Sequence, residues 1–522
     1  MLARRSRPQC SKRHQGIGKL PLMRSTGRQL RILVTLGSPS MLRIYDATLR
    51  ALADRGHRVT LVVNAFKPSV DVVDIDDERV RFAGVVPKRR DVWAAFLRSL
   101  RTRMDFVHYL DGRFADTPLL QTRMYTQAVP APLRRVWKLR SISTLRVGRL
   151  LRVLKAIERA VPLNRRVARF LAKQRPDVVF VSPLIHGIAD QDDMVRAARV
   201  AGVPVVAGIA GWDNLTSKGR LRAKTDAIVV WNDQLQREAI EFHGVAPERV
   251  VVTGAQVYDY LFERHPSTTR DEFCRMLGLP ADRVLILFAG SSRVVGQSTR
   301  SKAEIPFVRD WLTALRASGD PRLRDAAVLI RPHPLMVDRW KAADFSDLGP
   351  VAVWPSTSVA GTDAHRTTLF DSLFHCDAVV GLNTSVMIEA SILRKPVLSI
   401  VLPDFADVQD GTRCFRYLRP EHGGFLQLAS SFEQHLEQLS AALHAPELVA
   451  AQAERFVASF VRPHGPGIAC APLLADAIEQ VGWMGIAPSR QEPRGSRTVR
   501  ALLWPIAIGM GWRETRHRGS SG

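Results

Sequence analysis

The chain has 522 residues, of which 46% are hydrophobic, and this is enough apolar material for two cores rather than one. A formal net charge of +25 and a pI near 10.8 favour anionic partners, namely acidic lipid, nucleic acid or phosphorylated substrates. The five cysteines show no CxxC pair and no metal-ligand spacing, which indicates a reducing compartment. The sequence contains no run of about 18 apolar residues, so no membrane-spanning helix is expected.

The N-terminal residues 1–29 are rich in arginine and lack an apolar core segment, so we expect a disordered basic tail and no signal peptide. The pattern changes at Arg31, where an apolar run predicts a strand that ends at Gly37. A helical pattern over 41–55 ends at Gly56, and a second apolar run follows it. These three segments predict one βαβ unit.

Residues 84–166 interrupt the alternation of strands and helices. This segment contains 19 Lys and Arg against 5 Asp and Glu, with aromatic residues and leucines between them. We interpret it as a helical insert at the edge of the first domain, basic on one face. One interpretation is contact with anionic lipid, which is worth roughly 1 kcal/mol for each Lys or Arg near the surface; the other is a solvated helix hairpin.

The alternation resumes after the insert and continues almost to the end of the chain. Strands are predicted near 176–182, 203–209, 225–231, 249–254, 283–290, 327–331, 351–354, 378–382 and 397–401, with helices between them and closing helices over 432–444 and 466–481. We therefore predict an α/β protein with two Rossmann-like, doubly wound parallel-sheet domains, 30–262 and 263–485, which face each other across a cleft, and a flexible tail over 486–522. Ligands of such sheets bind beyond the carboxyl ends of the strands.

A candidate phosphate loop follows the apolar run 378–382. Asn383, Thr384 and Ser385 can cap the helix that comes next, and Pro396 ends that helix before another strand begins. The start of a helix presents unpaired N–H groups and a partial positive charge, both of which attract phosphate. The pattern is thus typical of a phosphate-binding βαβ unit.

Two facing Rossmann-like domains with a phosphate loop in the second resemble the GT-B glycosyltransferase fold over about residues 30–485. The stretch Asn383-Thr-Ser-Val-Met-Ile-Glu-Ala, followed by Lys395-Pro-Val-Leu, resembles the nucleotide-sugar loop of UDP-N-acetylglucosamine 2-epimerases and related transferases. This resemblance implies that Asn383, Thr384 and Ser385 hold the donor phosphate and that Glu389 binds ribose hydroxyls. The turn is Asn-Thr-Ser where the epimerases have Ser-Gly-Gly, and this difference weighs against an epimerase.

The stretch Arg331-Pro-His-Pro resembles the His-Pro motif of bacterial sialyltransferases, polysialyltransferases and CDP-glycerol glycerophosphotransferases. The resemblance implies that Arg331 and His333 contact the donor phosphate, and the flanking prolines limit the backbone and aim the side chain between them. Further donor contacts are expected after the first strand of the second domain, from Ser291, Ser292 and Arg293. The alternatives are a rigid loop at the His-Pro motif and an ordinary βα turn after residue 290.

Glycosyl transfer also requires a base that deprotonates the acceptor, and we expect it at a strand end of the first domain. The candidates are Asp213 in Gly211-Trp-Asp-Asn and His186 in Ser182-Pro-Leu-Ile-His-Gly. Gly211 to Gly219 also resembles a loop that recurs in polysaccharide-type members of the same broad group. The pair Asp192-Asp193 opens a predicted helix and is interpreted as a helix-dipole feature, not as a metal-binding pair.

We therefore predict a metal-independent glycosyltransferase, or phosphopolyol transferase, of the inverting type. It takes a nucleotide sugar or CDP-polyol as substrate, needs no cofactor, and acts on a surface glycan or lipid-linked acceptor. The expected location is cytoplasmic and peripheral at the anionic inner face of the membrane. The apolar stretch 501–512, with Pro505 inside it and arginines around it, is either an interfacial segment or a mobile tail.

Two other functions fit parts of the same pattern. A nucleotide-sugar 2-epimerase has the same fold, but it needs a set of acid and base carboxylates near the sugar, and residue 388, beside Glu389, is an isoleucine. A nucleic-acid-binding protein fits the charge, but no motif with base-stacking aromatic residues is found, so no nucleic-acid partner is expected.

Overall fold

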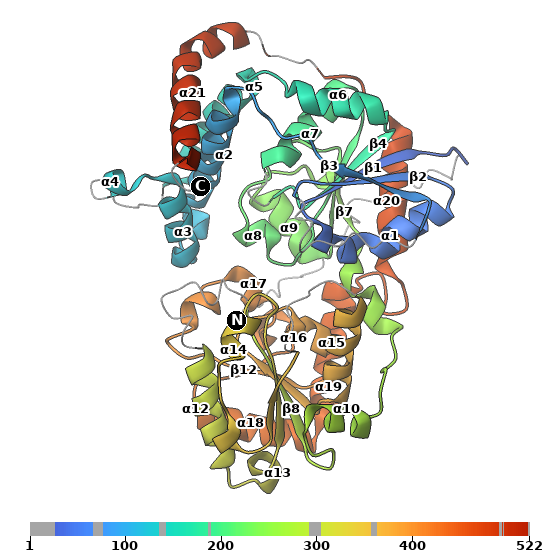
Figure 1. The fold of residues 1–522 in the computed structure, drawn as a ribbon, viewed down its shortest axis with the longest axis vertical. Helices are drawn as coiled ribbons and strands as arrows, with labels where there is room; N and C mark the ends of the chain where they lie inside the picture. Colours follow the sequence, from blue (N-terminus) through green and yellow to red (C-terminus); the bar gives the residue numbers. More distant parts are fainter. Residues whose placement is uncertain are drawn as a thin grey trace, which may run out of the picture.

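The computed structural model describes residues 27–65, 77–134, 142–185, 189–291, 304–355, 363–489, 493 and 495–519. Figure 1 shows two α/β domains that follow one another along the long axis, with a group of helices beside the first. Both central sheets are parallel throughout, and together they confirm the predicted fold class.

The first domain contains a seven-stranded sheet with the order β3-β2-β1-β4-β5-β6-β7. Its strands are β1 (Arg31–Leu36), β2 (Arg58–Val63), β3 (Val80–Val85), β4 (Val178–Ser182), β5 (Val205–Gly208), β6 (Ala227–Val230) and β7 (Val250–Val252). Its helices include α1 (Leu42–Asp54), α6 (Arg165–Gln174), α7 (Ala189–Val200), α8 (Asn214–Ser217) and α9 (Asp233–Glu241). The inner strands are runs of buried apolar residues, and such runs need helices on both sheet faces.

The second domain contains a six-stranded sheet with the order β10-β9-β8-β11-β12-β13. Its strands are β8 (Leu285–Ala289), β9 (Ala327–Arg331), β10 (Val351–Val353), β11 (Ala378–Gly381), β12 (Val397–Ile400) and β13 (Gln427–Ala429). Its helices include α10 (Arg270–Leu277), α12 (Glu304–Arg316), α13 (Pro321–Arg324), α14 (Val337–Trp340), α15 (Asp363–His375), α16 (Val386–Ile392), α17 (Arg413–Arg416), α18 (Phe432–His444) and α19 (Pro446–Phe456). The central pair is β8 and β11, in which Leu287 pairs with Val379. The loops after β9 and β11 therefore leave the same edge of the sheet.

The last helix of the α/β alternation, α20 (Cys470–Met484), packs on the first domain, although the sequence pattern placed it in the second. The chain leaves the second domain through a short π-helical turn, Val457–Val461, and crosses back. Leu474, Ile478 and Val481 of α20 are buried with the side chains of β1 and α1 in one core. The hydrophobic pattern of a helix predicts that one face is buried but does not indicate which sheet covers it.

The basic insert forms α2 (Trp93–Tyr109), α3 (Pro118–Ala128), α4 (Ala131–Arg134) and α5 (Thr144–Ala160). The C-terminal helix α21 (Ser496–Gly519) packs against α2 and α5, so most of the stretch predicted as a flexible tail is a docked helix. These helices enclose an apolar core of their own. It includes Trp93, Leu97, Tyr109 and Phe114, and Ala507 of α21 is buried in it.

Asp192 and Asp193 are buried in α7 and paired with arginines, so the interpretation of this pair as a helix-dipole feature is wrong. Arg101 of α2 donates to Asp193 Oδ1 at 2.9 Å, and Arg222 Nε donates to Asp192 Oδ2 at 3.0 Å. Arg222 also donates to Asp105 of α2 at 2.6 Å. This ion cluster attaches the insert to the first domain, because each buried charge requires its partner.

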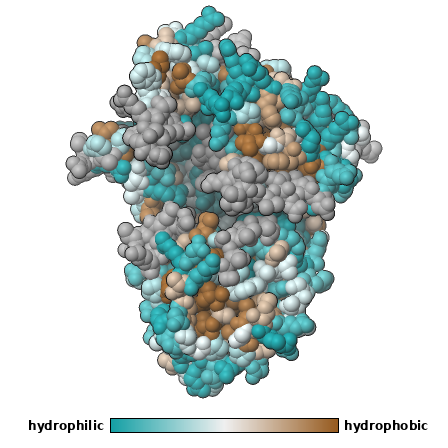
Figure 2. All heavy atoms as spheres, viewed as in Figure 1, coloured by the Kyte–Doolittle hydropathy of each residue, from teal (hydrophilic) through white to brown (hydrophobic). Residues whose placement is uncertain are grey.

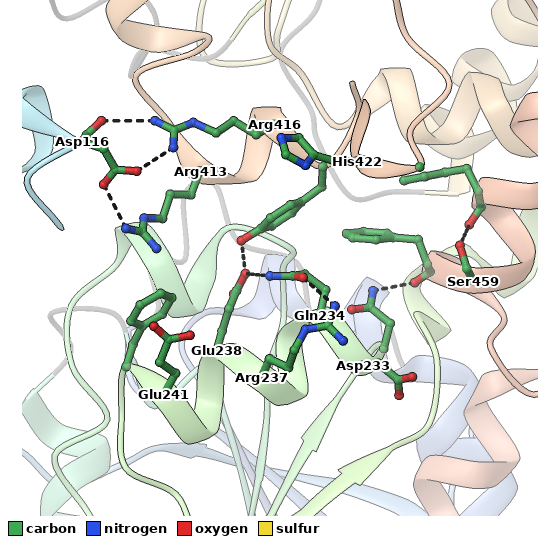
Figure 3. Close-up of a pocket in the computed structure, with 16 residues that line it drawn as sticks. Asp116, Asp233, Gln234, Arg237, Glu238, Glu241, Arg413, Arg416, His422 and Ser459 are labelled. Carbon is green, nitrogen blue, oxygen red and sulfur yellow. Dashed lines mark hydrogen bonds and ion pairs between the residues drawn. The ribbon is translucent and has the colours of Figure 1, made fainter. Parts of the chain in front are cut away.

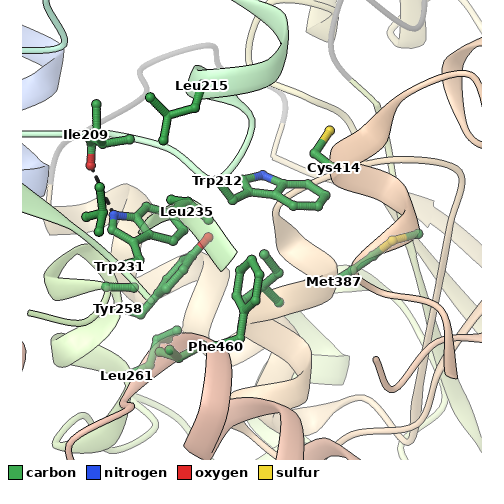
Figure 4. Close-up of a cluster of buried hydrophobic side chains, with 14 of the residues drawn as sticks. Ile209, Trp212, Leu215, Trp231, Leu235, Tyr258, Leu261, Met387, Cys414 and Phe460 are labelled. Carbon is green, nitrogen blue, oxygen red and sulfur yellow. Dashed lines mark hydrogen bonds between the residues drawn. The ribbon is translucent and has the colours of Figure 1, made fainter. Parts of the chain in front are cut away.

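Apolar side chains of both domains also meet in a single cluster, shown in Figure 4. Trp212 and Tyr258 come from the first domain, and Met387, Cys414 and Phe460 come from the second. At the periphery of this contact, Arg366 Nη1 of α15 donates to Asp46 Oδ2 of α1 at 2.9 Å. The two domains are therefore held together by a dry core, beside which open cavities remain.

Two kinds of feature are absent from the described residues. No group of three or more His, Cys, Asp or Glu side chains among them is arranged to hold a metal ion. No helix within the described ranges has the length and apolar character needed to cross a membrane.

Candidate functional site

A cavity of about 410 Å³ lies between the two domains and brings together residues from three parts of the chain. The second domain contributes His333, Asn383, Thr384, Ser385 and the segment 408–414, the first domain contributes Trp212, Asp213 and residues 216–218, and the insert contributes Thr117, Leu119, Leu120, Thr122 and Arg123. This volume is within the range of small-molecule sites. The candidate loop at 383–385, the His-Pro motif and one of the two candidate bases therefore share one cavity.

The turn at 383–385 presents the hydroxyl groups of Thr384 and Ser385, whose hydrogen bonds to the helix start are long or absent. Asn383 Nδ2 donates to the Val408 carbonyl at 2.6 Å, which fixes the turn, while Ser385 is exposed and its side chain makes no capping bond. Thr384 Oγ1 accepts only a long bond of 3.5 Å from the Val386 N–H. The expected capping is thus weak. Since α16 has only seven residues, a phosphate placed here would depend on hydroxyls and local amides more than on a helix dipole.

His333 follows β9 directly and faces the same cavity. Its Nδ1 accepts a hydrogen bond from the Leu335 N–H at 3.2 Å, so in the neutral ring the proton is on Nε2. Burial, with a smaller contribution from the cation of Arg43, lowers the pKa of His333 to about 4. The site therefore presents a neutral imidazole whose Nε2–H can donate to an anion.

Arg331 is placed differently from the expectation of a direct phosphate contact. It is 5% exposed, its guanidinium donates to the Thr368 carbonyl and to Ser372 Oγ, both at 3.2 Å, and it lies 5.4 Å from the centre of the Trp354 ring. Burial lowers its pKa to about 10, which leaves it cationic at neutral pH. Arg331 is thus a buried cation behind the site, and the residue of this motif that lines the cavity is His333.

Glu389, the expected ribose-binding residue, is a buried carboxyl group with a free oxygen. It is 9% exposed, and its Oε2 accepts no hydrogen bond from any residue that the structure describes. Burial raises its pKa to about 7, although the positive charges of Arg43 and Arg331 oppose that rise. Arg43 also influences His333, so the two groups share one electrostatic environment, but Glu389 is not among the residues that line the cavity.

The raised pKa of Glu389 has a measurable consequence for stability. An unfolded glutamate titrates near 4.5 and the folded one near 7, so between these values the native state holds the extra proton and the free energy of unfolding falls as pH rises. In Glu389→Gln we expect a shallower fall between pH 4.5 and 7, measured by urea denaturation. Glu272→Gln is the control, because Glu272 is an exposed capping residue whose pKa is lowered. Equal slopes in wild type and Glu389→Gln would contradict a carboxyl group that is protonated in the folded state.

Asp213 precedes α8 and is held by three donors. Its Oδ2 lies 3.0 Å from Lys218 Nζ and accepts from Ser217 Oγ at 3.2 Å, and its Oδ1 accepts from Asn214 Nδ2 at 3.0 Å. The side chain keeps 28% of its surface exposed. A fixed, partly open carboxylate at the cavity wall satisfies the geometric requirement for a general base.

The remaining predicted residues do not join this group. Ser291 is buried, and its backbone N–H donates to Glu304 Oε1 at 2.8 Å, so it is part of the domain interior and does not line the cavity. His186, Ser292 and Arg293 lie outside the described residues.

Several residues at the site had no recognisable signal in the sequence. Arg123 of α3 and Lys218 place positive charge around the cavity, and Arg413 of α17 adds a third cation. Arg123 and Thr117 belong to the insert, which was predicted at the domain edge but also forms one wall of the cavity. The basic composition of the insert indicated an anionic partner, but only the fold shows that α3 lies opposite the phosphate loop.

A second interdomain cavity of about 680 Å³ adjoins the first and shares Arg413 with it (Figure 3). Asp116 of the insert separates the two, because its carboxylate accepts from Arg413 at 2.9 Å and from Arg416 at 2.6 Å. Glu238 lies in the wall, bonded to the Tyr417 hydroxyl, and its Oε2 has no partner among the described residues. Burial raises the pKa of Glu238 to about 7.

No family model and no curated protein matches the chain. Among solved structures it is similar to UDP-GlcNAc 2-epimerase from Neisseria meningitidis bound to UDP-GlcNAc (14% identity, 86% of this chain and 99% of that one, TM-score 0.46). It is also similar to a glycosyltransferase from Rickettsia africae (11%, 87% and 99%, TM-score 0.49) and to WaaG, a glycosyltransferase involved in lipopolysaccharide biosynthesis (14%, 86% and 99%, TM-score 0.44). These similarities concern the fold alone, and the function is argued from the chain's own residues.

Proposed function

We propose that the protein is a glycosyltransferase, or a phosphopolyol transferase, that uses a nucleotide-activated donor. The observation that carries this proposal is that one interdomain cavity is lined by His333, Thr384 and Ser385 of one domain and by Asp213 of the other. Transfer needs a group that receives the phosphate charge and a group that deprotonates the acceptor, on opposite sides of the reacting carbon. The cavity offers both, one from each domain.

The charges around the cavity match a donor whose leaving group is a nucleotide phosphate. Three cations, Arg123, Lys218 and Arg413, line it together with one carboxylate, Asp213. The Nε2–H of His333 and the hydroxyls of Thr384 and Ser385 would donate to phosphate oxygens. Protein groups alone would thus stabilise the leaving group in this proposal, with no metal ion required.

In the proposed reaction an acceptor hydroxyl attacks the anomeric carbon of the donor sugar. Asp213 takes the hydroxyl proton, the new glycosidic bond forms, and the bond to the nucleotide phosphate breaks, so that the electron pair leaves with the phosphate. His333 and the two hydroxyls would interact most strongly with that developing charge. Hydrogen-bond donors accelerate a reaction when their interaction is stronger in the transition state than with the bound substrate.

The second cavity would hold the outer sugars of a glycan or lipid-linked acceptor. Four carboxylic acids, Asp116, Asp233, Glu238 and Glu241, line it with three arginines, so it is less favourable to an anion than the first cavity. Carboxylates accept hydrogen bonds from sugar hydroxyls, and side-chain amides both accept from them and donate to them. An uncharged, hydroxyl-rich chain therefore matches this lining better than a second phosphate does.

Asp213→Asn should lower turnover by about two to four orders of magnitude, the usual contribution of a general base, while donor affinity stays within about twofold. Turnover is measured by nucleotide release in the presence of acceptor, and donor affinity by calorimetry. Asp310→Asn, at an exposed position of α12, is the matched control and should behave as wild type. If Asp213→Asn retained full turnover, the base would have to be another residue.

The function is tested first by a thermal-shift panel of UDP, CDP, CMP, GDP and dTDP sugars, since a ligand of the folded state raises its apparent stability. At least one donor should raise the Tm, and an unchanged Tm across the panel would contradict the proposal. The sugar that binds is then incubated without acceptor. Asp213 is the one carboxylic acid among the described residues lining the cavity, which favours a transferase over a 2-epimerase, so no isomerised sugar should form; an isomerised product would identify the epimerase instead.

A further inference from the structure

Helices α5 and α21 lie side by side on α2, at the upper left of Figure 1, away from the cleft. The inner face of α21 is already used, because Ala507 is buried and Leu503 and Met510 pack against the same core. The outer face of α21 is apolar as well. Leu502 is 72% exposed, Ile506 53% and Trp512 69%.

A helix that is apolar on all sides is normally covered on all sides, because exposed apolar area is unfavourable in water. Leu502 and Ile506 are four residues apart, which places them on one face, and Thr498 and Gly509 extend that face without a charge. In Figure 2 apolar atoms are visible at the upper left, in the position of α21. Among the described residues, Leu502 and Ile506 remain more than half exposed.

The neighbouring α5 combines apolar and cationic residues on its own outer side. Leu145 is 63% exposed and Val153 58%, and the arginines Arg146, Arg149 and Arg152 are exposed between them. The single acidic residue of this helix, Glu158, is turned inward and accepts from Arg101 Nε at 2.7 Å. The outer side of α5 is therefore positive without a compensating carboxylate of its own.

We infer that the outer surfaces of α5 and α21 form a docking face for a bilayer that contains anionic phospholipid. We call this the α5–α21 face, and it consists of Leu145, Arg146, Arg149, Leu150, Arg152 and Val153 of α5 with Leu502, Trp504, Ile506 and Trp512 of α21. Leucine and tryptophan side chains enter the boundary between headgroups and acyl chains, while arginines pair with lipid phosphates. The sequence indicated membrane contact for the basic insert and, as one of two interpretations, for residues 501–512; the structure brings the two segments together in this face.

Charge complementarity selects this occupant over a second copy of the chain. A symmetric dimer through the α5–α21 face would bring the arginines of two α5 helices together, and like charges across an interface are repulsive. An anionic lipid surface instead neutralises them. The inference does not depend on the reaction in the cleft, since none of these residues lines either interdomain cavity.

The test is flotation of the full chain with vesicles of phosphatidylcholine, with and without phosphatidylglycerol. Wild type should float with the acidic vesicles, and binding should weaken as salt is added. The double variant Leu502→Glu/Ile506→Glu should bind at least about tenfold more weakly, because it places two charges in the lipid boundary. Leu448→Glu is the matched control, since Leu448 is a 73% exposed leucine of α19 in the second domain, and it should bind as wild type.

The contrary outcomes are separate from those for the transferase proposal. If wild type floats with neither vesicle, or if the double variant floats as well as wild type, the α5–α21 face does not bind a membrane. If wild type is a dimer that the double variant converts to a monomer, with no flotation by either, a second copy is the occupant. The thermal shift with donor sugars, run on the same preparations, shows whether each variant is folded and whether donor binding holds independently of lipid binding.

Discussion

His333→Ala is expected to weaken donor binding by about one to two orders of magnitude, because a hydrogen bond to a charged group contributes roughly 1.5–3 kcal/mol. The imidazole faces the interdomain cavity with its Nδ1 already occupied by the Leu335 N–H. Its Nε2–H is thus available to donate to a phosphate oxygen. Calorimetric titration with the nucleotide sugar that stabilises wild type measures the loss.

Turnover should fall by more than binding does in this variant, since the charge on the phosphate grows as the bond to the sugar breaks. The control is His444→Ala at the end of α18, an exposed histidine outside both cavities, which should change neither quantity. If His333→Ala bound the donor as tightly as wild type, His333 would have only a structural role in the loop.

Arg222→Met is expected to cost about 3–5 kcal/mol of unfolding free energy, the usual result of removing one partner from a buried ion pair. The guanidinium is 2% exposed and bonds to Asp105 of α2 and to Asp192 of α7. Without it two carboxylates remain in the interior with too little compensation. Urea denaturation followed by circular dichroism measures the change.

The matched control is Arg309→Met, which removes an ion pair between Arg309 and Asp347 whose side chains are 43% and 58% exposed. Exposed pairs contribute about 0–1 kcal/mol, so this variant should remain close to wild type. If Arg222→Met were equally mild, the cluster would not hold the insert to the first domain. Should Arg222→Met fail to fold, Arg222→Lys, which keeps the charge, should restore part of the stability.

The insert connects this stability prediction to the site. Its helix α2 is anchored by the buried ions, and α3, which follows it, lines the cavity opposite the phosphate loop. A loosened insert would therefore also weaken donor binding. The effect would differ from that of His333→Ala, because it would accompany a loss of unfolding free energy.

The fold class, and the positions of the two candidate motifs at strand ends of the second domain, were predictable from local patterns. Apolar runs such as 378–382 and 327–330 are typical of buried parallel strands when they alternate with helices. The first run is followed by the Asn-Thr-Ser turn, and the second by Arg331 and a proline. Because parallel strands share one carboxyl edge, the His-Pro motif after β9 and the Asn-Thr-Ser turn after β11 had to lie near each other. Glu389, one turn into α16, was expected to contact the ribose at that edge, whereas the structure buries it outside the residues that line the cavity.

What the sequence by itself determined, then, is the two doubly wound sheets and the loops that follow their strands, since these depend on interactions within a few tens of residues. Only the tertiary structure decided that α20 returns to the first sheet, that α21 docks on the insert, and that Asp192 and Asp193 are paired with Arg101 and Arg222 instead of capping a helix. Arg331 is the same case, because its motif suggested phosphate contact but its guanidinium is bonded within the second domain. These partners are far apart in the chain. They pair because each buried charge needs an opposite charge, and each apolar face needs a cover, once the sheets have formed. A local pattern does not contain that information.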